Sequence, residues 1–141
     1  MDNVSRKEIK YLISLEKYLR IKPKLLSFLT YDPHSSDEGY VVRSLYFDTY
    51  ENRDMYDTLY GLEKKHKIRL RIYSIHDSMV KLEWKRKIGT DSHKITFLIT
   101  RNEAESMIKG YYDFIRERVE PEAILLYRIL VKEVYQPRIV V

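Results

Sequence analysis

The sequence predicts an α+β domain in which helices pack on the outside of an antiparallel β-sheet. Charged and apolar residues alternate over residues 67–72 and 80–85, which is the period of two that a strand requires. Short turn signals separate these stretches, and segments beyond residue 100 place apolar residues at helical spacing. The 141 residues, 44% of them hydrophobic, suit one domain with a substantial core.

The first half of the chain is predicted to begin with a strand and a helix. Ser14 provides an N-cap for that helix, and Pro23 is expected to kink or split it. The Asp32–Pro33 pair opens a polar loop. The expected order is a strand over 4–13, a helix from about 15, a loop over 32–39, a strand over 40–48, and a short helix or irregular turn over 52–62.

The second half is predicted to consist of a hairpin, a further strand and two helices. Thr100 and Glu103 form a capping box that starts the first of these helices. The apolar face of that helix is expected to contain Ala104, Met107, Ile108 and Tyr111. The expected order is a basic hairpin over 64–88 turning near 76–78, a turn over 89–92, a strand over 93–99, a helix, a break at 120–121, a second helix over about 123–134, and a strand beginning at 138.

The positive charge is concentrated in one segment. Residues 64–94 carry a net charge of +7, whereas the whole chain carries +5. Because side chains in a strand alternate between faces, the charges of each hairpin strand share one side. The two rows are Lys67, Arg69 and Arg71 in the first strand, and Lys81, Glu83, Lys85 and Lys87 in the second. Like charges repel across strands, so this pattern predicts an anionic partner, and phosphate suits Arg and Lys best.

The residues alone leave two forms of the sheet open. If the charged side faces solvent, the sheet is an ordinary half-buried one. If the sheet curls, the charged side becomes a lumen and the helices cover its outside.

Composition excludes several chemistries. The chain has no cysteine, so disulfides, thiolate nucleophiles and Cys-ligated zinc are ruled out. Residues 1–10 lack the apolar core of a signal peptide, and no apolar run approaches the roughly 20 residues that span a bilayer. The expected location is cytoplasmic, with membrane contact only through a partner. The four histidines show no metal-binding spacing and are assigned no role.

Five short strings follow one another in the chain: residues 6–11 (RKEIKY), 44–49 (SLYFDT), 67–73 (KIRLRIY), 82–87 (LEWKRK) and Lys94. In this order they resemble a known family, the VTC domain of polyphosphate polymerases. VTC domains belong to the CYTH-like superfamily of triphosphate tunnel metalloenzymes, so the resemblance implies an antiparallel barrel around a basic lumen. It therefore favours a sheet curled into part of a triphosphate-tunnel barrel, with the helices outside.

The resemblance also implies roles for individual residues. Phosphate oxygens are expected to be held by Lys10, Arg69, Arg71, Lys85 and Lys94, with Arg6 and Lys87 as further candidates. Mn²⁺ or Mg²⁺ is expected to assist phosphoryl transfer, which depends on positioning and charge neutralisation. Glu83 and Glu8 are the candidate metal ligands because they are the acids on the predicted lumen strands, although Glu83 is expected rather to neutralise its cationic neighbours. No catalytic residue is assigned.

The chain departs from the family at Val141, where the family continues into further tunnel strands. Residues 1–141 are therefore interpreted as a single domain that supplies about half a barrel. The chain is expected to be a fragment, inactive alone, or to form a homo-oligomer in which a second copy completes the tunnel. Polyphosphate, triphosphate or nucleotide phosphates are the expected partners.

Other interpretations remain open beside this one. The cationic rows are, on the simplest view, solvated strand faces, and Asp48 is expected to accept hydrogen bonds at a strand end. A single-stranded nucleic-acid module would use the basic hairpin for the backbone, with Tyr73 and Trp84 stacking on bases. Alternation argues against it, because Trp84 lies on the face opposite Lys85. A noncatalytic polyphosphate sensor is the third possibility.

Overall fold

The computed structural model describes residues 2–6, 9, 11–31 and 39–141, with side chains from residue 9 onward. The chain divides into two compact units, which are described separately. The sheet unit comprises Met1–Lys7 and Val42–Val141. The second unit, Glu8–Val41, is called the α1 segment below.

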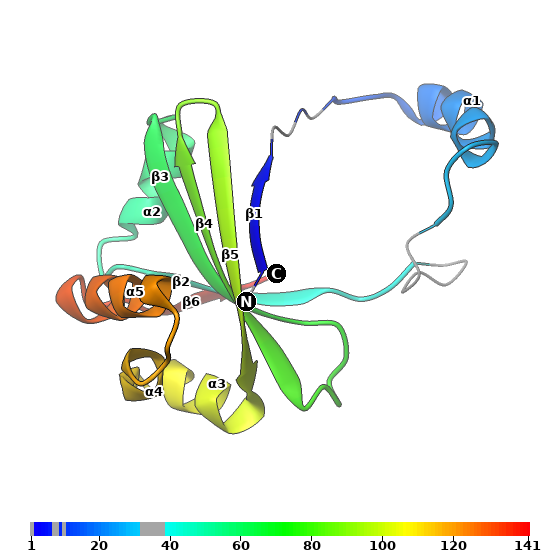
Figure 1. Cartoon of the computed structure of the whole chain (residues 1–141). Coiled ribbons are helices and arrows are strands. Elements are labelled where there is room, and N and C mark those ends of the chain that lie inside the picture. Colours follow the sequence, from blue (N-terminus) through cyan, green and yellow to red (C-terminus); the bar gives the residue numbers. More distant parts are fainter. Residues whose placement is uncertain (1, 7–8, 10, 32–38) are drawn as a thin grey trace. The chain divides into compact units, whose positions relative to one another are not determined.

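The sheet unit is built on one antiparallel sheet of six strands (Figure 1). The strands are β1 (Asp2–Arg6), β2 (Arg43–Asp48), β3 (Lys64–Ile72), β4 (Met79–Ile88), β5 (Asp91–Thr100) and β6 (Gln136–Val140). They lie in the order β1-β5-β4-β3-β2-β6, so β1 and β6 form the two edges. Within the described residues these edges do not pair with each other, so the sheet is open and does not form the closed barrel of the tunnel enzymes.

The predicted basic hairpin is confirmed as β3 and β4, with β5 following. The Asp77 carboxylate fixes the β3–β4 turn by accepting from the backbone amides of Tyr73 and Ser74 at 2.8 and 2.9 Å. Gly89, at φ +57°, makes the tight turn into β5, and a side chain would be strained there. The register places Ile68 opposite Trp84 and Leu70 opposite Leu82, so the apolar residues of both strands share a face.

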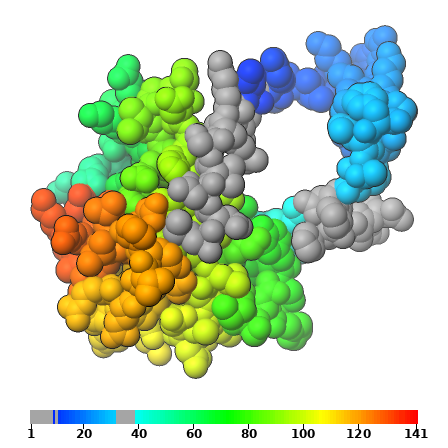
Figure 2. Space-filling model, in the orientation of Figure 1, coloured from blue at the N-terminus to red at the C-terminus, as the bar shows by residue number. Residues whose placement is uncertain are grey.

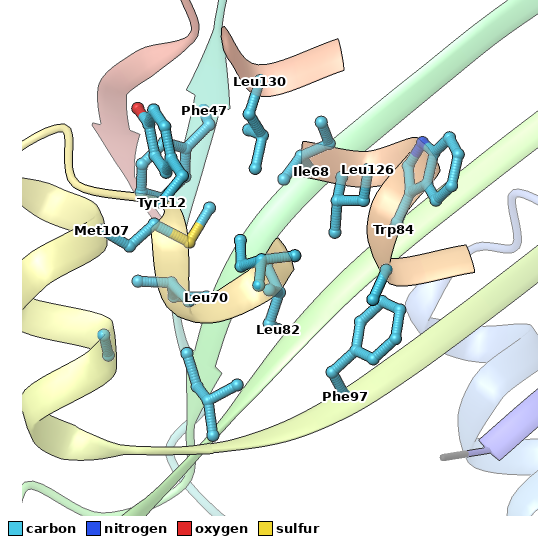
Figure 3. Close-up of a cluster of buried hydrophobic side chains, with 14 of the residues drawn as sticks. Phe47, Ile68, Leu70, Leu82, Trp84, Phe97, Met107, Tyr112, Leu126 and Leu130 are labelled. Atoms are coloured by element: carbon cyan, nitrogen blue, oxygen red, sulfur yellow. The ribbon is translucent and has the colours of Figure 1, made fainter. Parts of the chain in front are cut away.

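The hydrophobic core lies between that apolar face and three helices, α3 (Arg101–Ile108), α4 (Asp113–Arg116) and α5 (Pro121–Lys132). Figure 3 shows Met107, Leu126 and Leu130 of the helices pointing toward Leu70 and Leu82 of the sheet. In Figure 2, α5 in orange and the adjoining yellow residues of α3 form a continuous surface. The core consists of Phe47, Ile68, Leu70, Val80, Leu82, Trp84, Ile95, Phe97, Ile99, Ala104, Met107, Tyr112, Ile115, Ala123, Leu126, Leu130 and Tyr135.

Local signals explain where the helices begin and end. The Thr100–Glu103 capping box is present, as predicted, because each residue's side chain accepts from the other's backbone amide. The helix ends at Ile108 and the chain then turns at Gly110, so Tyr111 does not lie on this helix, contrary to the prediction. Ile108 and Tyr111 are 43% and 66% exposed. The short α4 was not predicted, and α5 begins at Pro121, which suits a first helical position.

Asp48 ends β2 and starts α2 (Arg53–Leu59). Its Oδ1 accepts from the amides of Thr49 and Asp54 at 2.7 and 2.9 Å, and its Oδ2 accepts from Met55 at 2.9 Å. The prediction that Asp48 serves as a hydrogen-bond acceptor at a strand end is therefore confirmed.

The α1 segment contains one helix, α1 (Leu15–Leu26), capped by Ser14, whose Oγ accepts from the amide of Lys17 at 3.2 Å. Pro23 was predicted to kink or split the helix, and the split is wrong because the helix continues through it. Pro23 lies close to the C-terminal end, where few hydrogen bonds of the helix depend on it. The strand predicted over 4–13 ends at Arg6, and residues 9 and 11–14 have no regular structure. The predicted loop over 32–39 lies outside the described residues, except Gly39.

In the part of the chain that the structure describes, none of the helices has the length and apolar character required to cross a bilayer.

Candidate anion-binding face

One face of the sheet collects the cations of three neighbouring strands. The register of β3 with β4 and of β4 with β5 fixes which side chains share this face. Four cations come from β3, three from β4 and one from β5, and Glu83 lies among them. The cation face, as it is called below, contains Lys65, Lys67, Arg69, Arg71, Lys81, Lys85, Lys87 and Lys94 together with Glu83.

Most cations of this face stand directly opposite another cation. The opposed pairs are Lys65 with Lys87, Lys67 with Lys85, Arg71 with Lys81, and Lys85 with Lys94. Like charges directly opposite each other destabilise an antiparallel pair of strands. Between β3 and β4, the opposed pair of unlike charge on this face is Arg69 with Glu83. An anion bound over the face would relieve the repulsion in the other pairs.

Glu83 lies where three cations converge on one carboxylate. Arg69 donates from Nε to Oε2 at 2.7 Å, and its Nη2 lies 2.6 Å from the same oxygen. Lys94 Nζ donates to Oε1 at 3.2 Å, and Arg71 Nη1 lies 3.9 Å from Oε2. The Glu83 side chain is 3% exposed, whereas Arg69, Arg71 and Lys94 retain 21%, 23% and 33% exposure. The cations therefore point toward one another and remain accessible.

These contacts shift the ionisation of both partners. Burial raises the pKa of Glu83, but the charge and hydrogen bonds of Arg69, and then of Lys94, outweigh it and hold that pKa below its usual value. Burial lowers the pKa of Arg69, yet the Glu83 carboxylate raises it above its usual value. Glu83 is therefore ionised at neutral pH and acts as an internal counter-ion.

The expected metal site finds no support in the described residues. Both oxygens of Glu83 already accept from cations, and no group of three His, Asp or Glu side chains in the described part of the chain could hold a metal ion. The geometry favours neutralisation of neighbouring cations as the role of Glu83. Glu8, the other candidate ligand, lies outside the described residues.

Three neutral polar side chains lie beside Arg69, Arg71 and Glu83 on this face, and none of them was predicted to have a role there. Arg69 Nη1 contacts the Tyr46 hydroxyl at 2.7 Å, and Arg71 Nε donates to Ser44 Oγ at 3.2 Å. Thr96 stands opposite Glu83, and its buried hydroxyl has no hydrogen-bond partner in the structure. Ser44 and Tyr46 belong to one of the strings that resemble the VTC domain, which was the available signal.

A comparison with known families identifies the chain. The model of the VTC domain matches residues 5–141, which is nearly the whole length. The chain belongs to the VTC domain family. It is therefore a polyphosphate-related domain, and the resemblance seen in the five strings is confirmed. A search of curated proteins finds no match to the chain.

The structure of this VTC domain brings together some of the expected phosphate ligands. Arg69, Arg71 and Lys94 surround Glu83, and Lys85 stands directly opposite Lys94. The other three candidates are not among the residues around Glu83 that the structure describes. Lys87 is exposed toward the end of β4 and stands opposite Lys65, Arg6 pairs with Ser92 through its backbone while its side chain is not described, and Lys10 lies outside the described residues.

A separate polar cluster ties α2, β3 and the start of β6 together in this VTC domain. Tyr135 donates from its hydroxyl to Asp54 Oδ2 at 2.8 Å, and His66 Nε2 lies 2.9 Å from Asp54 Oδ1 and 2.5 Å from the Tyr135 hydroxyl. Burial, followed by the charge of Asp54, raises the pKa of Tyr135. Tyr135 is therefore neutral, and its hydroxyl donates a hydrogen bond to the buried Asp54 side chain, which is a structural role.

A hollow of about 420 Å³ adjoins the cation face. Tyr46 and Lys67 line it from the cation face, and Met55, Arg138 and Ile139 line it from α2 and β6. The face is therefore continued on this side by a partly apolar recess, which adds one further cation, Arg138, and two acids, Asp48 and Asp54.

Proposed function

We propose that this VTC domain binds inorganic polyphosphate or triphosphate on the cation face. The observation that carries the proposal is the opposition of cations across β3, β4 and β5. Glu83 is the shared counter-ion of Arg69, Arg71 and Lys94 among them. Repulsive pairs in a packed sheet lower stability, and a polyanion bound over them would convert the repulsion into attraction.

The geometry of the arginines suits phosphate. Arg69 is held by Glu83 on one side and Tyr46 on the other, so its planar group is oriented before a ligand arrives. Arginine forks bind phosphate oxygens in pairs, while Lys85 and Lys94 add point charges beside them. Polyphosphate repeats its charge along a flexible chain, so it can contact several of these cations at once. Arg6, Lys10 and Lys87 are proposed to extend the same track.

We further propose that the domain acts in phosphoryl transfer within a completed basic tunnel. Closing the open sheet requires additional strands beside β6 or β1, and a second copy of the chain is the proposed source. Mn²⁺ or Mg²⁺ belongs to this proposed activity, because such ions neutralise developing charge in phosphoryl transfer. The described residues supply no site for the ion, so no step is assigned to it. Identifying the products formed from polyphosphate would show whether the reaction is synthesis or hydrolysis.

A nucleic-acid module is less well supported than polyphosphate binding. Trp84 is 2% exposed beneath the helices, so it is not available for stacking on bases. The Tyr73 ring lies 4.8 Å from Lys81 Nζ, in a cation–π contact within the hairpin.

Calorimetry with tripolyphosphate at near-physiological salt tests the proposal. Arg71→Gln and Lys85→Gln are each expected to weaken binding by about tenfold, because each removes a charge-assisted hydrogen bond. Arg128→Gln is the matched control, since Arg128 is an exposed cation of α5 away from the cation face. Equal losses in all three variants, or no binding by the folded protein, would refute the proposal.

Competition between tripolyphosphate and a single-stranded oligonucleotide separates the two polyanions. Displacement of tripolyphosphate by the oligonucleotide at matched phosphate concentration would favour the nucleic-acid module. Binding of tripolyphosphate without turnover, in the presence of Mn²⁺, would identify a noncatalytic sensor.

A further inference from the structure

Three buried nitrogen atoms at one end of the apolar face of the sheet have no hydrogen-bond partner in the structure. They are Trp84 Nε1, Arg86 Nε and His93 Nδ1. The indole and guanidinium nitrogens can only donate, and the imidazole nitrogen donates when it carries the proton. Buried polar groups in native proteins are nearly always satisfied by protein, water or an ion. Three unsatisfied donors in one place therefore indicate that something accepts from them.

The strand register brings these three side chains together. Arg86 stands directly opposite His93 of β5, and Trp84 is two residues before Arg86 on the same face of β4. The guanidinium carbon of Arg86 lies 4.3 Å from the centre of the Trp84 ring, in a cation–π contact. All three residues belong to the sheet unit, so their grouping is independent of where the α1 segment lies.

Arg86 has no counter-ion in the part of the chain that the structure describes. Its side chain is partly buried, and no carboxylate of the described residues forms an ion pair with it. Asp91 is two residues before His93, but it is exposed and pairs with neither residue. His66 stands opposite Arg86 on β3 and already contacts an acid, Asp54, at 2.9 Å. Because a partly buried guanidinium without a counter-ion is costly, the site favours an anion.

We propose that Trp84, Arg86 and His93 form a second anion site, which binds inorganic orthophosphate. The donors come from two strands, and the four oxygens of a tetrahedral phosphate can accept from several directions, whereas a carboxylate offers two oxygens in one plane. Arginine also binds phosphate oxygens in pairs. Arg86 and His93 are partly exposed, which gives a small anion a way in. Lys85 and Arg86 point to opposite faces of β4, so the site does not depend on the proposed polyphosphate binding.

Fluorescence of Trp84 tests the proposal, because Trp84 is the single tryptophan of the chain. Orthophosphate, added to the full chain at an ionic strength held constant with chloride, is expected to change this fluorescence along a saturable curve. Arg86→Gln is expected to raise the half-saturating concentration about tenfold, because it removes a charge-assisted hydrogen bond. Arg86→Lys keeps the charge but not the planar group and is expected to raise it less. Lys85→Gln, on the other face of the same strand, is the matched control and should leave the curve unchanged.

Thermal unfolding gives a second readout and shows that each variant is folded. Orthophosphate is expected to raise the Tm of the native chain and of Lys85→Gln, because a ligand that binds only the folded state stabilises it. The increase should be much smaller in Arg86→Gln and in His93→Leu. Titration with tripolyphosphate separates this site from the cation face: Lys85→Gln should weaken tripolyphosphate binding and spare the response to orthophosphate, and Arg86→Gln should do the reverse.

Three results would overturn the proposal. The absence of a saturable response to orthophosphate would show that water satisfies the three nitrogen atoms. A response that Arg86→Gln leaves unchanged, or that Lys85→Gln abolishes, would show that the anion binds at another place. An equal response to acetate at the same ionic strength would refute the preference for phosphate.

Discussion

The two faces of β3, β4 and β5 carry opposite chemistry on the same backbone. On one face Ile68, Leu82, Trp84 and Phe97 are at most 2% exposed and pack beneath the helices. On the other face cations stand opposite cations around Glu83. The first face stabilises the fold, whereas the second contains opposed pairs of like charge whose repulsion an additional anion would relieve. Neighbouring residues of one strand therefore have different roles. Substitutions on the apolar face should mainly lower stability, and substitutions on the cation face should mainly weaken anion binding.

The largest expected effect lies on the apolar face. Trp84→Ala removes the largest fully buried side chain and is expected to lower the free energy of unfolding by about 4 kcal/mol. Leu98→Ala is the control, because Leu98 is on the cation side of β5 and 51% exposed, and a change below about 0.5 kcal/mol is expected. Denaturant unfolding measures both. Similar losses of stability in the two variants would contradict the view that the apolar face stabilises the fold and the cation face does not.

Removal of the internal counter-ion is expected to have the next largest effect. Glu83→Gln leaves Arg69, Arg71 and Lys94 without the carboxylate that they share, which is expected to cost about 3 kcal/mol of stability. Tripolyphosphate should then stabilise the variant more than the native chain, since its charge replaces that of Glu83. Thermal unfolding with and without tripolyphosphate measures the stability lost in the variant and the stabilisation that the ligand provides.

Glu105→Gln is the control for this substitution. Glu105 is 58% exposed and lies 3.9 Å from Arg101, so its removal is expected to cost less than about 0.5 kcal/mol. An unchanged response of Glu83→Gln to tripolyphosphate would indicate that the ligand does not bind beside Glu83.

The depressed pKa of Glu83 also predicts a dependence of stability on pH. Because Arg69 and Lys94 hold that pKa below its usual value of 4.5, the unfolded chain takes up the proton first as the pH falls. The contribution of Glu83 is therefore fully present above pH 4.5 and is lost as the pH falls through the lower pKa of the folded state. Chemical unfolding across this range is expected to show a shallower loss of stability in Glu83→Gln than in the native chain. Parallel curves would show that Glu83 does not titrate in this way.

Local features of the fold could be predicted from the sequence, and long-range features could not. The alternation in β3 and β4, the Ser14 cap and the Thr100–Glu103 box are set by residues close together in the chain. By contrast, Tyr135 donates a hydrogen bond to Asp54, which is 81 positions away in the sequence. No sequence periodicity predicts a contact between residues so far apart. The approach of Tyr46 to Arg69 depends on the pairing of β2 with β3. The open edges of the sheet likewise follow from strand order, which the pattern of each strand does not contain.

The smallest expected effect has the most informative sign. Lys87 stands directly opposite Lys65, so Lys87→Gln removes a repulsive pair and is expected to raise the free energy of unfolding by about 0.5 kcal/mol. The same substitution should weaken tripolyphosphate binding if the track of cations extends to this end of the hairpin. Lys109→Gln, an exposed cation outside the sheet, should change neither quantity. A gain in stability together with a loss of affinity would show that the cation face is kept for its ligand, because its contribution to the fold alone is unfavourable. A loss of stability would show instead that these lysines form favourable contacts within the sheet.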